Sequence, residues 1–386
     1  MDKPIDEGKE SSRPNGVRAR VPTELSSVSW SRSCPGIPLE QLEPELPEIG
    51  FDLGKIAGEL TVANPEVVAA ARWGHELLRS VDSLSFATIE DLYRARRSAL
   101  FPKAAARPGE YWGLLLLRAT ELSLKLPSGS KAKSTMSQGL KVIAQVWGAI
   151  LSDVSGSLPP QQAQRSLAAI RGLLSGEAGK LHLPPAEQEM VDFANEVWVC
   201  LWQLLRLHPR VEELEPLLLQ ALSLIFDAYE YRLAIRFSDS LISDALYINV
   251  LSHRAQLVFM GLVDLLAAGT TANDEERESL RRALWFGQRM MTLSDEMGTY
   301  PHRLAQGDLS GEMVSAVLTM GVSSLARVEG ALERPEIADR ARLELHRRWV
   351  TAAKALQQMV SLLSWVDLNA YLQSLTRLRT LALLQV

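Results

Sequence analysis

Cysteine is scarce in this chain. Cys34 and Cys200 are the two cysteines among 386 residues, and neither belongs to a CxxC or cysteine–histidine spacing that would close a zinc site. This excludes a disulfide scaffold and favours a reducing, cytoplasmic location. No apolar run precedes Gly50, so we expect no secretory signal.

Long apolar runs and an excess of positive charge are also missing. The strongest apolar stretches, residues 112–117 and 257–268, are shorter than the about 20 residues that a spanning helix needs, and the second contains Asp264. We therefore expect buried core helices and no membrane span. Lys and Arg total 41 against 46 Asp and Glu, a formal net charge of −5, so charge gives no support to nucleic-acid binding.

Signatures of β structure and of nucleotide binding are absent as well. No stretch alternates with period two, and there is no GxGxxG or GK[ST] motif. From Phe51 onward apolar residues recur instead at the helical spacing of three and four. Proline and glycine divide this region into about ten to twelve helical segments, with breaks at Pro102 and at residues 108–109, 127–129, 156–160, 176–185, 208–209, 269–273 and 334–335. No 34- or 40-residue repeat supports a solenoid, so we predict one all-α bundle.

The first 47 residues differ in composition from the rest. They are rich in Pro, Ser, Glu and Arg, a mixture that buries too little apolar surface to offset chain entropy. We predict a disordered N-terminal tail over residues 1–47 and one α-helical domain over residues 48–386. Apolar residues around Trp30 and Ile37 leave open that part of the tail folds over the mouth of a pocket.

The most informative segment is DEMGTYPHRLAQGD, residues 295–308. On a helix Asp295, Thr299 and Arg303 are spaced i, i+4, i+8, so their side chains share one face. Such a face can present oxygen ligands to a hard cation such as Mg²⁺. An exposed polar helix face is the alternative, and Pro301 would remove one backbone hydrogen bond if the helix continued through it.

Here the sequence resembles the class I terpene synthases, specifically the bacterial cyclases of the all-α terpenoid fold. Their second metal motif has the form Asn-Asp-x-x-Ser-x-x-x-Glu and is followed a few residues later by Gly-Asp, as Gly307 and Asp308 are here. On that pattern the motif's four named positions are held, in order, by Asp295, Glu296, Thr299 and Arg303. Two of the three ligand positions keep an oxygen, and the third carries a cation.

Other landmarks of the family follow in the same order, over residues 51–386. Its aspartate-rich first metal motif corresponds to residues 117–121, LRATE, where only Glu121 stays acidic and Arg118 introduces a cation. Arg254 resembles the family's diphosphate-sensing arginine, several residues beyond the usual place. Arg377, followed by Leu378, resembles one half of the Arg–Tyr pair that clamps the diphosphate.

The resemblance implies a single helical bundle of the terpenoid-synthase type that encloses an apolar cavity. It also implies an isoprenoid substrate, a prenyl diphosphate, that is ionised with Mg²⁺ and cyclised as a carbocation. The departures from both metal motifs remove anionic ligands, so ordinary three-metal ionisation is hard to sustain. Guanidinium groups can bind diphosphate oxygens in place of metal ions.

We therefore predict a terpene-cyclase-like enzyme, a carbon–oxygen lyase acting on phosphates, with a non-standard diphosphate and metal site. The candidate residues fall into three roles. They are Arg118, Arg254 and Arg377 for the diphosphate, Asp295 and Thr299 for metal, and Glu121 and Arg303 for catalysis, with Glu121 as the proton-transfer group. The alternative is a catalytically inactive relative that acts as a lipid-binding protein or partner subunit. The oligomeric state stays open, with a homodimer among the options.

Overall fold

The computed structural model describes most of the chain beyond residue 117. It covers residues 118–119, 121–126, 131–174, 183–236, 244–268, 272–305, 308–309, 311–322 and 327–383, all within the compact unit Pro47–Val386. The predicted tail over residues 1–47 and the apolar stretch 112–117 lie outside the described residues.

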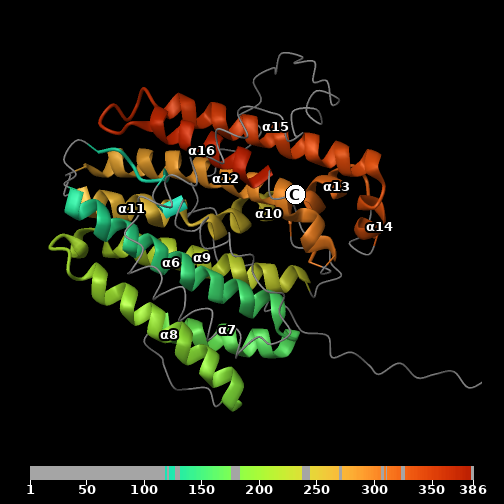
Figure 1. The fold of residues 1–386 in the computed structure, drawn as a ribbon, viewed down its shortest axis with the longest axis horizontal. Coiled ribbons are helices and arrows are strands. Elements are labelled where there is room, and N and C mark those ends of the chain that lie inside the picture. The colour runs from blue at the N-terminus through green and yellow to red at the C-terminus, as the bar shows by residue number, and fades with distance from the viewer. Residues whose placement is uncertain are drawn as a thin grey trace, which may run out of the picture. The chain divides into compact units, whose positions relative to one another are not determined.

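The described residues form helices and no strands, which confirms the all-α class (Figure 1). In order, the elements are α6 (Lys131–Ser157), α7 (Pro160–Leu174), α8 (Pro185–Leu205), α9 (Val211–Arg236), α10 (Asp244–Leu251), the 3₁₀ turn η3 (Ser252–Ala255), α11 (Leu257–Ala268), α12 (Asp274–Ala305), α13 (Glu312–Thr319), α14 (Val328–Leu332), α15 (Pro335–Met359) and α16 (Leu368–Leu383).

Helix boundaries follow the predicted breaks. Helices α7, α8 and α15 each begin with a proline, which suits the first helical turn because that backbone N–H has no helical partner. In contrast, α12 continues through Pro301 and ends at Ala305. The predicted complication at Pro301 is therefore absorbed within one continuous helix, which places residues 295, 299 and 303 on the same element.

The long helix α12 is the central element of the described unit. It packs against α15 and α16, and also against α11, η3 and α13. A second group is built around α6, which packs against α7, α8, α9 and α11. Figure 1 shows α15 and α16 above α12, with α6, α9, α8 and α7 below it. Helix α11 contacts both α12 and α6 and so joins the two groups.

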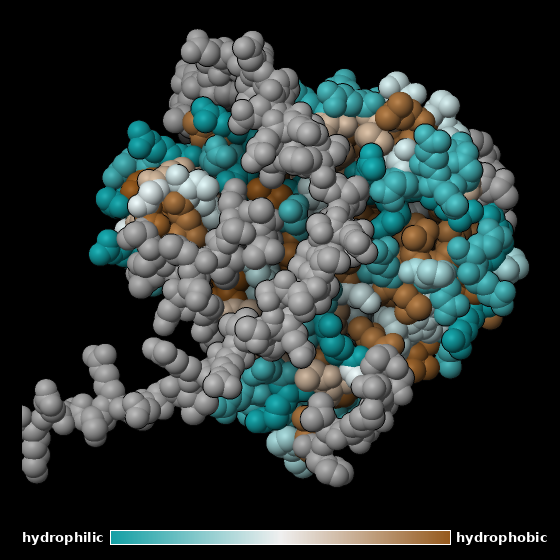
Figure 2. Space-filling model, turned by 180° about the vertical axis from the view of Figure 1, so that it is seen from behind, coloured by the Kyte–Doolittle hydropathy of each residue, from teal (hydrophilic) through white to brown (hydrophobic). Residues whose placement is uncertain are grey.

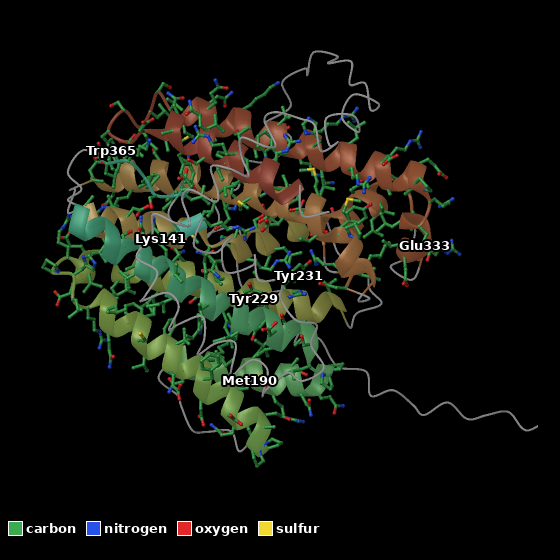
Figure 3. The ribbon with its side chains drawn as sticks, viewed as in Figure 1. Lys141, Met190, Tyr229, Tyr231, Glu333 and Trp365 are labelled. Carbon is green, nitrogen blue, oxygen red and sulfur yellow. The ribbon has the colours of Figure 1, made fainter. Side chains whose placement is uncertain are left out.

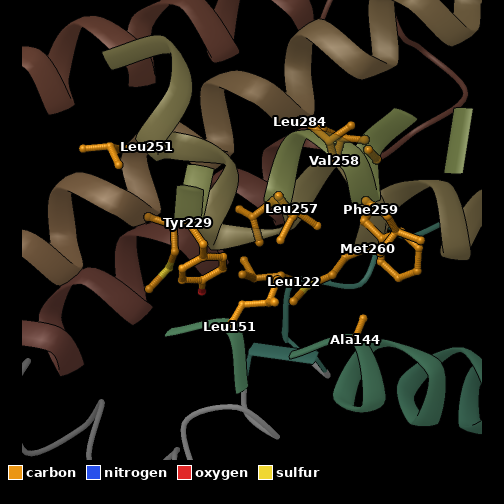
Figure 4. Close-up of a cluster of buried hydrophobic side chains, with 14 of the residues drawn as sticks. Leu122, Ala144, Leu151, Tyr229, Leu251, Leu257, Val258, Phe259, Met260 and Leu284 are labelled. Carbon is orange, nitrogen blue, oxygen red and sulfur yellow. The ribbon is translucent and has the colours of Figure 1, made fainter. Parts of the chain in front are cut away.

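Helix α11 is the core helix that the sequence predicts. All twelve of its residues are buried, because it is apolar around its whole circumference. Figure 4 shows its Leu257, Phe259 and Met260 packed with Leu122 and Leu151. A Cβ atom at Gly261 would lie 2.3 Å from a methyl carbon of Leu284 on α12, so glycine lets these two helices approach closely.

No single helix among the described residues is long and apolar enough to cross a membrane. One pair, Ile248–Ala255 with Leu257–Ala268, meets that test only when taken together, and it is bent by 49°. On the face drawn in Figure 2, the coloured residues are largely hydrophilic, with apolar ones in small patches between them. Large exposed apolar side chains come from separate parts of the described chain: Val199, Leu207, Met320 and Leu362.

A buried ion pair holds the segment 121–126 against the bundle. The carboxylate of Asp264 on α11 accepts hydrogen bonds from Lys141 Nζ of α6 at 2.5 Å, from Ser137 Oγ at 2.7 Å and from the backbone N–H of Leu124 at 2.8 Å. Lys141, labelled in Figure 3, also donates to Ser123 Oγ at 2.8 Å. These bonds fix the short segment that carries the predicted site residue Glu121, and the backbone N–H of Leu122 in this segment donates to the carbonyl oxygen of Arg118 at 3.0 Å.

Candidate functional site

Three of the predicted site residues meet at one face of α12. The Arg118 guanidinium donates through Nη2 to Asp295 Oδ1. Arg303 lies about two turns after Asp295 on α12. Its Nη1 donates to Glu296 Oε2, and its Nε donates to Asp308 Oδ2 at 3.1 Å. The helical spacing of residues 295 and 303 thus brings both side chains to one region, as the sequence predicts.

Helix α9 and the turn η3 each add an arginine to this region. Arg232 on α9 donates to Asp308 Oδ2 at 2.6 Å and to Ser152 Oγ of α6 at 2.9 Å. Arg254 on η3 acts electrostatically on Asp295 and is itself affected by Arg303, Arg232 and Glu296. We call this set the arginine cluster; it consists of Arg118, Arg232, Arg254 and Arg303 with the carboxylates Asp295, Glu296 and Asp308.

Among the described residues of the arginine cluster, four guanidinium groups stand against three carboxylates. Arg254 is the group left over. Its one hydrogen bond to a described residue runs from Nε to the carbonyl oxygen of Leu251, at 3.3 Å. Burial, together with Arg303 and Arg232, lowers the pKa of Arg254 to about 10, so the guanidinium stays charged at neutral pH.

Two further arginines keep unused donors. The Nε atoms of Arg118 and Arg232 are both buried without a hydrogen-bond partner. A buried N–H without a partner costs free energy, and a guanidinium has five such donors in a fixed planar arrangement. Together with Arg254, these groups come from three separate elements, and all of them could donate to a bound anion.

A second, fully paired network holds η3 in place beside the cluster. Glu312, the first residue of α13, pairs with Arg289 of α12 and with Arg348 of α15, the latter at 3.5 Å. Burial alone would raise the pKa of Glu312, but Arg289, Arg348 and Arg254 together hold it below the usual value. Arg289 also donates to Ser252 Oγ of η3 at 2.9 Å, which fixes the residue two positions before Arg254.

Glu296 links the cluster to α13. Its Oε1 accepts the backbone N–H of Met313 at 3.3 Å, one of the free N–H groups at the start of that helix. A Cβ atom at Gly311 would lie 1.7 Å from this oxygen. Gly311 is therefore required for the carboxylate to reach the helix while it also pairs with Arg303.

The predicted metal ligands have other partners. Thr299 Oγ1 donates to the backbone oxygen of Asp295 at 2.7 Å, and the Asp295 carboxylate pairs with Arg118. No group of three or more His, Cys, Asp or Glu residues suited to a metal ion occurs in the described part of the chain. As arranged, the carboxylates of the cluster pair with guanidinium groups, and Mg²⁺ binding stays a prediction of the resemblance.

Glu121 and Arg377 lie together, on the side of α16. Ser374 Oγ donates to Glu121 Oε2 at 3.3 Å. Burial raises the pKa of Glu121, against the opposing effects of Ser374, Arg377 and Lys125. Arg377 is exposed, and its charge acts on the Glu121 carboxylate. The structure thus places the predicted proton-transfer group and this predicted diphosphate ligand near each other, beside α16.

Sequence reasoning missed Arg232 as a site residue. The spacing within residues 227–232 suggests a local ion pair, yet Asp227 and Glu230 pair with Arg171 of α7. Arg232 turns instead toward Asp308. The sequence did contain a signal for this role. Arg232 follows the buried Tyr229 of α9, labelled in Figure 3, by three residues, and this spacing puts Arg232 on the inward face of the helix.

We expect acid to destabilise the turn that carries Arg254. The buried His253 accepts a hydrogen bond at Nδ1 from Gln288 Nε2 at 3.0 Å, and Gln288 Oε1 accepts the backbone N–H of Val258. This fixes a neutral imidazole, and burial, with a contribution from Arg281, lowers its pKa to about 4.

Because the unfolded chain binds this proton below about pH 6.5, the free energy of unfolding should fall by about 3 kcal/mol between pH 7 and pH 4 through this group. Urea unfolding of the wild type and of His253→Asn between pH 7 and pH 4 measures the contribution of His253 to this pH dependence. The variant should have the flatter pH profile, and equal slopes would contradict the assignment.

Comparison with known proteins gives this chain no family, since no protein-family model and no curated protein sequence matches it. The fold and the site define an all-α protein with a partly buried, arginine-rich cluster.

Proposed function

We propose that this chain is a terpene-cyclase-like enzyme that binds an isoprenoid diphosphate at the arginine cluster and cyclises it as a carbocation. The observation that carries the proposal is Arg254, a charged guanidinium within electrostatic range of Arg232 and Arg303 and without an ion pair to a carboxylate among the described residues. Arg254 is partly buried, and an uncompensated charge in such a place is costly. A diphosphate would supply the missing counter-charge through bidentate hydrogen bonds.

The origin of the donors supports an anion larger than one carboxylate. Arg254 comes from η3, Arg232 from α9 and Arg118 from the segment before α6. Arg118 and Arg232 each keep an unpartnered Nε, and donors from three parts of the chain suit the several oxygens of a diphosphate. The apolar cavity for the hydrocarbon and the terpenoid-synthase type of bundle are part of the same proposal.

The chemistry follows from this arrangement. The carbon–oxygen bond of the substrate breaks, both electrons leave with the diphosphate oxygen, and a double bond of the substrate attacks the allylic cation to close a ring. Guanidinium groups already in place stabilise the charge on the leaving diphosphate. A base then removes a proton, for which Glu121 is the predicted acceptor because burial raises its pKa toward neutrality. Mg²⁺ enters none of these steps.

The test is incubation of the full chain with geranyl, farnesyl and geranylgeranyl diphosphates, with Mg²⁺ in one arm and EDTA in the other. Volatile products and released diphosphate are measured. We expect product from at least one substrate in both arms. Product confined to the Mg²⁺ arm would show that the eroded motifs still hold metal, and failure to bind any of the three diphosphates would refute the proposal.

The alternative function is a catalytically inactive protein that binds an isoprenoid diphosphate or serves as a partner subunit. One observation favours it: each carboxylate of the arginine cluster already pairs with an arginine, so the cluster offers anion binding without a ligand set for ionisation by metal. Calorimetric binding of the same three diphosphates, set beside the incubation, separates the two functions, because the alternative gives tight binding without released diphosphate.

A further inference from the structure

Asp295 is held more loosely than the other carboxylates of the arginine cluster. Its side chain is 33% exposed, against 4% for Glu296 and 8% for Asp308. Glu296 has two partners, Arg303 and the N–H of Met313, and Asp308 also has two, Arg232 and Arg303. Asp295 has one side-chain partner among the described residues, Arg118. It can therefore be displaced without breaking any other bond of the cluster.

Arg118 depends on Asp295 in the same way. Its Nη2 donates to Asp295 and its Nε has no partner, whereas Arg232 and Arg303 each bond two groups in the cluster and its surroundings. The Arg118–Asp295 pair lies within electrostatic range of Arg254. An anion that neutralises Arg254 therefore repels the Asp295 carboxylate and competes with it for Arg118.

We infer that Asp295 is a built-in competitor for the ligand: in the free protein its carboxylate occupies the place on Arg118 that a phosphate oxygen takes in the complex. Binding exchanges one anion for the other on Arg118 and releases Asp295 to solvent. The inference rests on the proposed diphosphate site and adds an autoinhibitory contact to it. It also reverses the role that the motif assigns to Asp295, because a metal ligand would strengthen diphosphate binding and a competitor weakens it.

Affinity for inorganic pyrophosphate in the presence of EDTA tests the inference, measured by calorimetry on the full chain. Asp295→Asn keeps the shape of the side chain and removes its charge, so we expect binding about tenfold tighter than in the wild type. Asp339→Asn is the matched control, since Asp339 is exposed and pairs locally with Arg342. This control removes the same charge from the protein and should leave the affinity unchanged.

A second pair of variants locates the gain on Arg118. In an Arg118→Gln background, Asp295→Asn should bring much less tightening, because the contested donor is gone and only the repulsion between the Asp295 carboxylate and the anion is relieved. Thermal melting shows whether Asp295→Asn folds. If it does not, Asp295→Ala takes its place in the affinity measurement. Wild-type binding with no tightening in Asp295→Asn or Asp295→Ala would overturn the inference and leave the proposed function standing. Absence of pyrophosphate binding in the wild type and in the variants would overturn both.

Discussion

Replacing Arg254 by methionine is expected to weaken binding of farnesyl diphosphate by about a hundredfold or more, because charge-assisted hydrogen bonds to phosphate are the strong ones. The same variant should unfold at an equal or higher urea concentration than the wild type. Arg254 has a single described hydrogen bond, to a backbone oxygen, and lies beside Arg232 and Arg303. Methionine of similar length removes a repulsive, partly buried charge at the cost of that one bond.

The opposite signs of these two effects make the prediction sharp. If Arg254 served the structure, its replacement would lower the stability of the protein. If it serves a ligand, its replacement lowers the affinity alone. Arg210→Met is the matched control, since Arg210 pairs with Glu213 on the surface of the described chain and should leave both quantities close to wild type. Binding is measured by calorimetry and stability by urea unfolding. Unchanged affinity in Arg254→Met would show that the ligand does not use this residue.

The fold class was predictable because helical periodicity and the lack of alternation are properties of the local sequence. Residues 257–268 are apolar on every side, and α11 is buried on every side. The break at residues 334–335 likewise becomes the start of α15 at Pro335. The packing of α12 against five other elements was not predictable in this way, because periodicity gives the buried face of a helix and not its neighbour.

The candidate site was likewise predictable within one helix and not between helices. Spacing along one helix places Asp295 and Arg303 on a common face, and both join the arginine cluster. Spacing does not reveal the hydrogen bond of a threonine hydroxyl to the preceding turn, which engages Thr299. Nor does it reveal contacts between helices, and so Arg232 was assigned to a local ion pair. Its partner Asp308 lies 76 residues away in the sequence.

The second large effect concerns the ion pair that holds the segment with Arg118 and Glu121. Replacing Asp264 by alanine is expected to lower the free energy of unfolding by about 3–5 kcal/mol, because it leaves the other charge of a buried pair uncompensated. Lys141 is wholly buried, and burial already lowers the pKa of its ammonium, with Asp264 opposing that shift. Without Asp264, the N–H of Leu124 and the hydroxyl of Ser137 also lose their acceptor.

A double variant separates the lost charge pairing from lost packing. Lys141→Met with Asp264→Leu replaces both charges by apolar side chains of comparable size, and buried pairs so replaced are often neutral or more stable. We therefore expect the double variant to recover the part of the loss that comes from the uncompensated Lys141 charge, whereas the part that comes from the N–H of Leu124 and the hydroxyl of Ser137 remains. Asp339→Ala, at an exposed carboxylate, should change stability by less than about 0.5 kcal/mol. Urea unfolding followed by circular dichroism compares the three. If Asp264→Ala were no less stable than Asp339→Ala, the pair would not be what ties this segment to α6 and α11, and Arg118 would owe its position to other contacts.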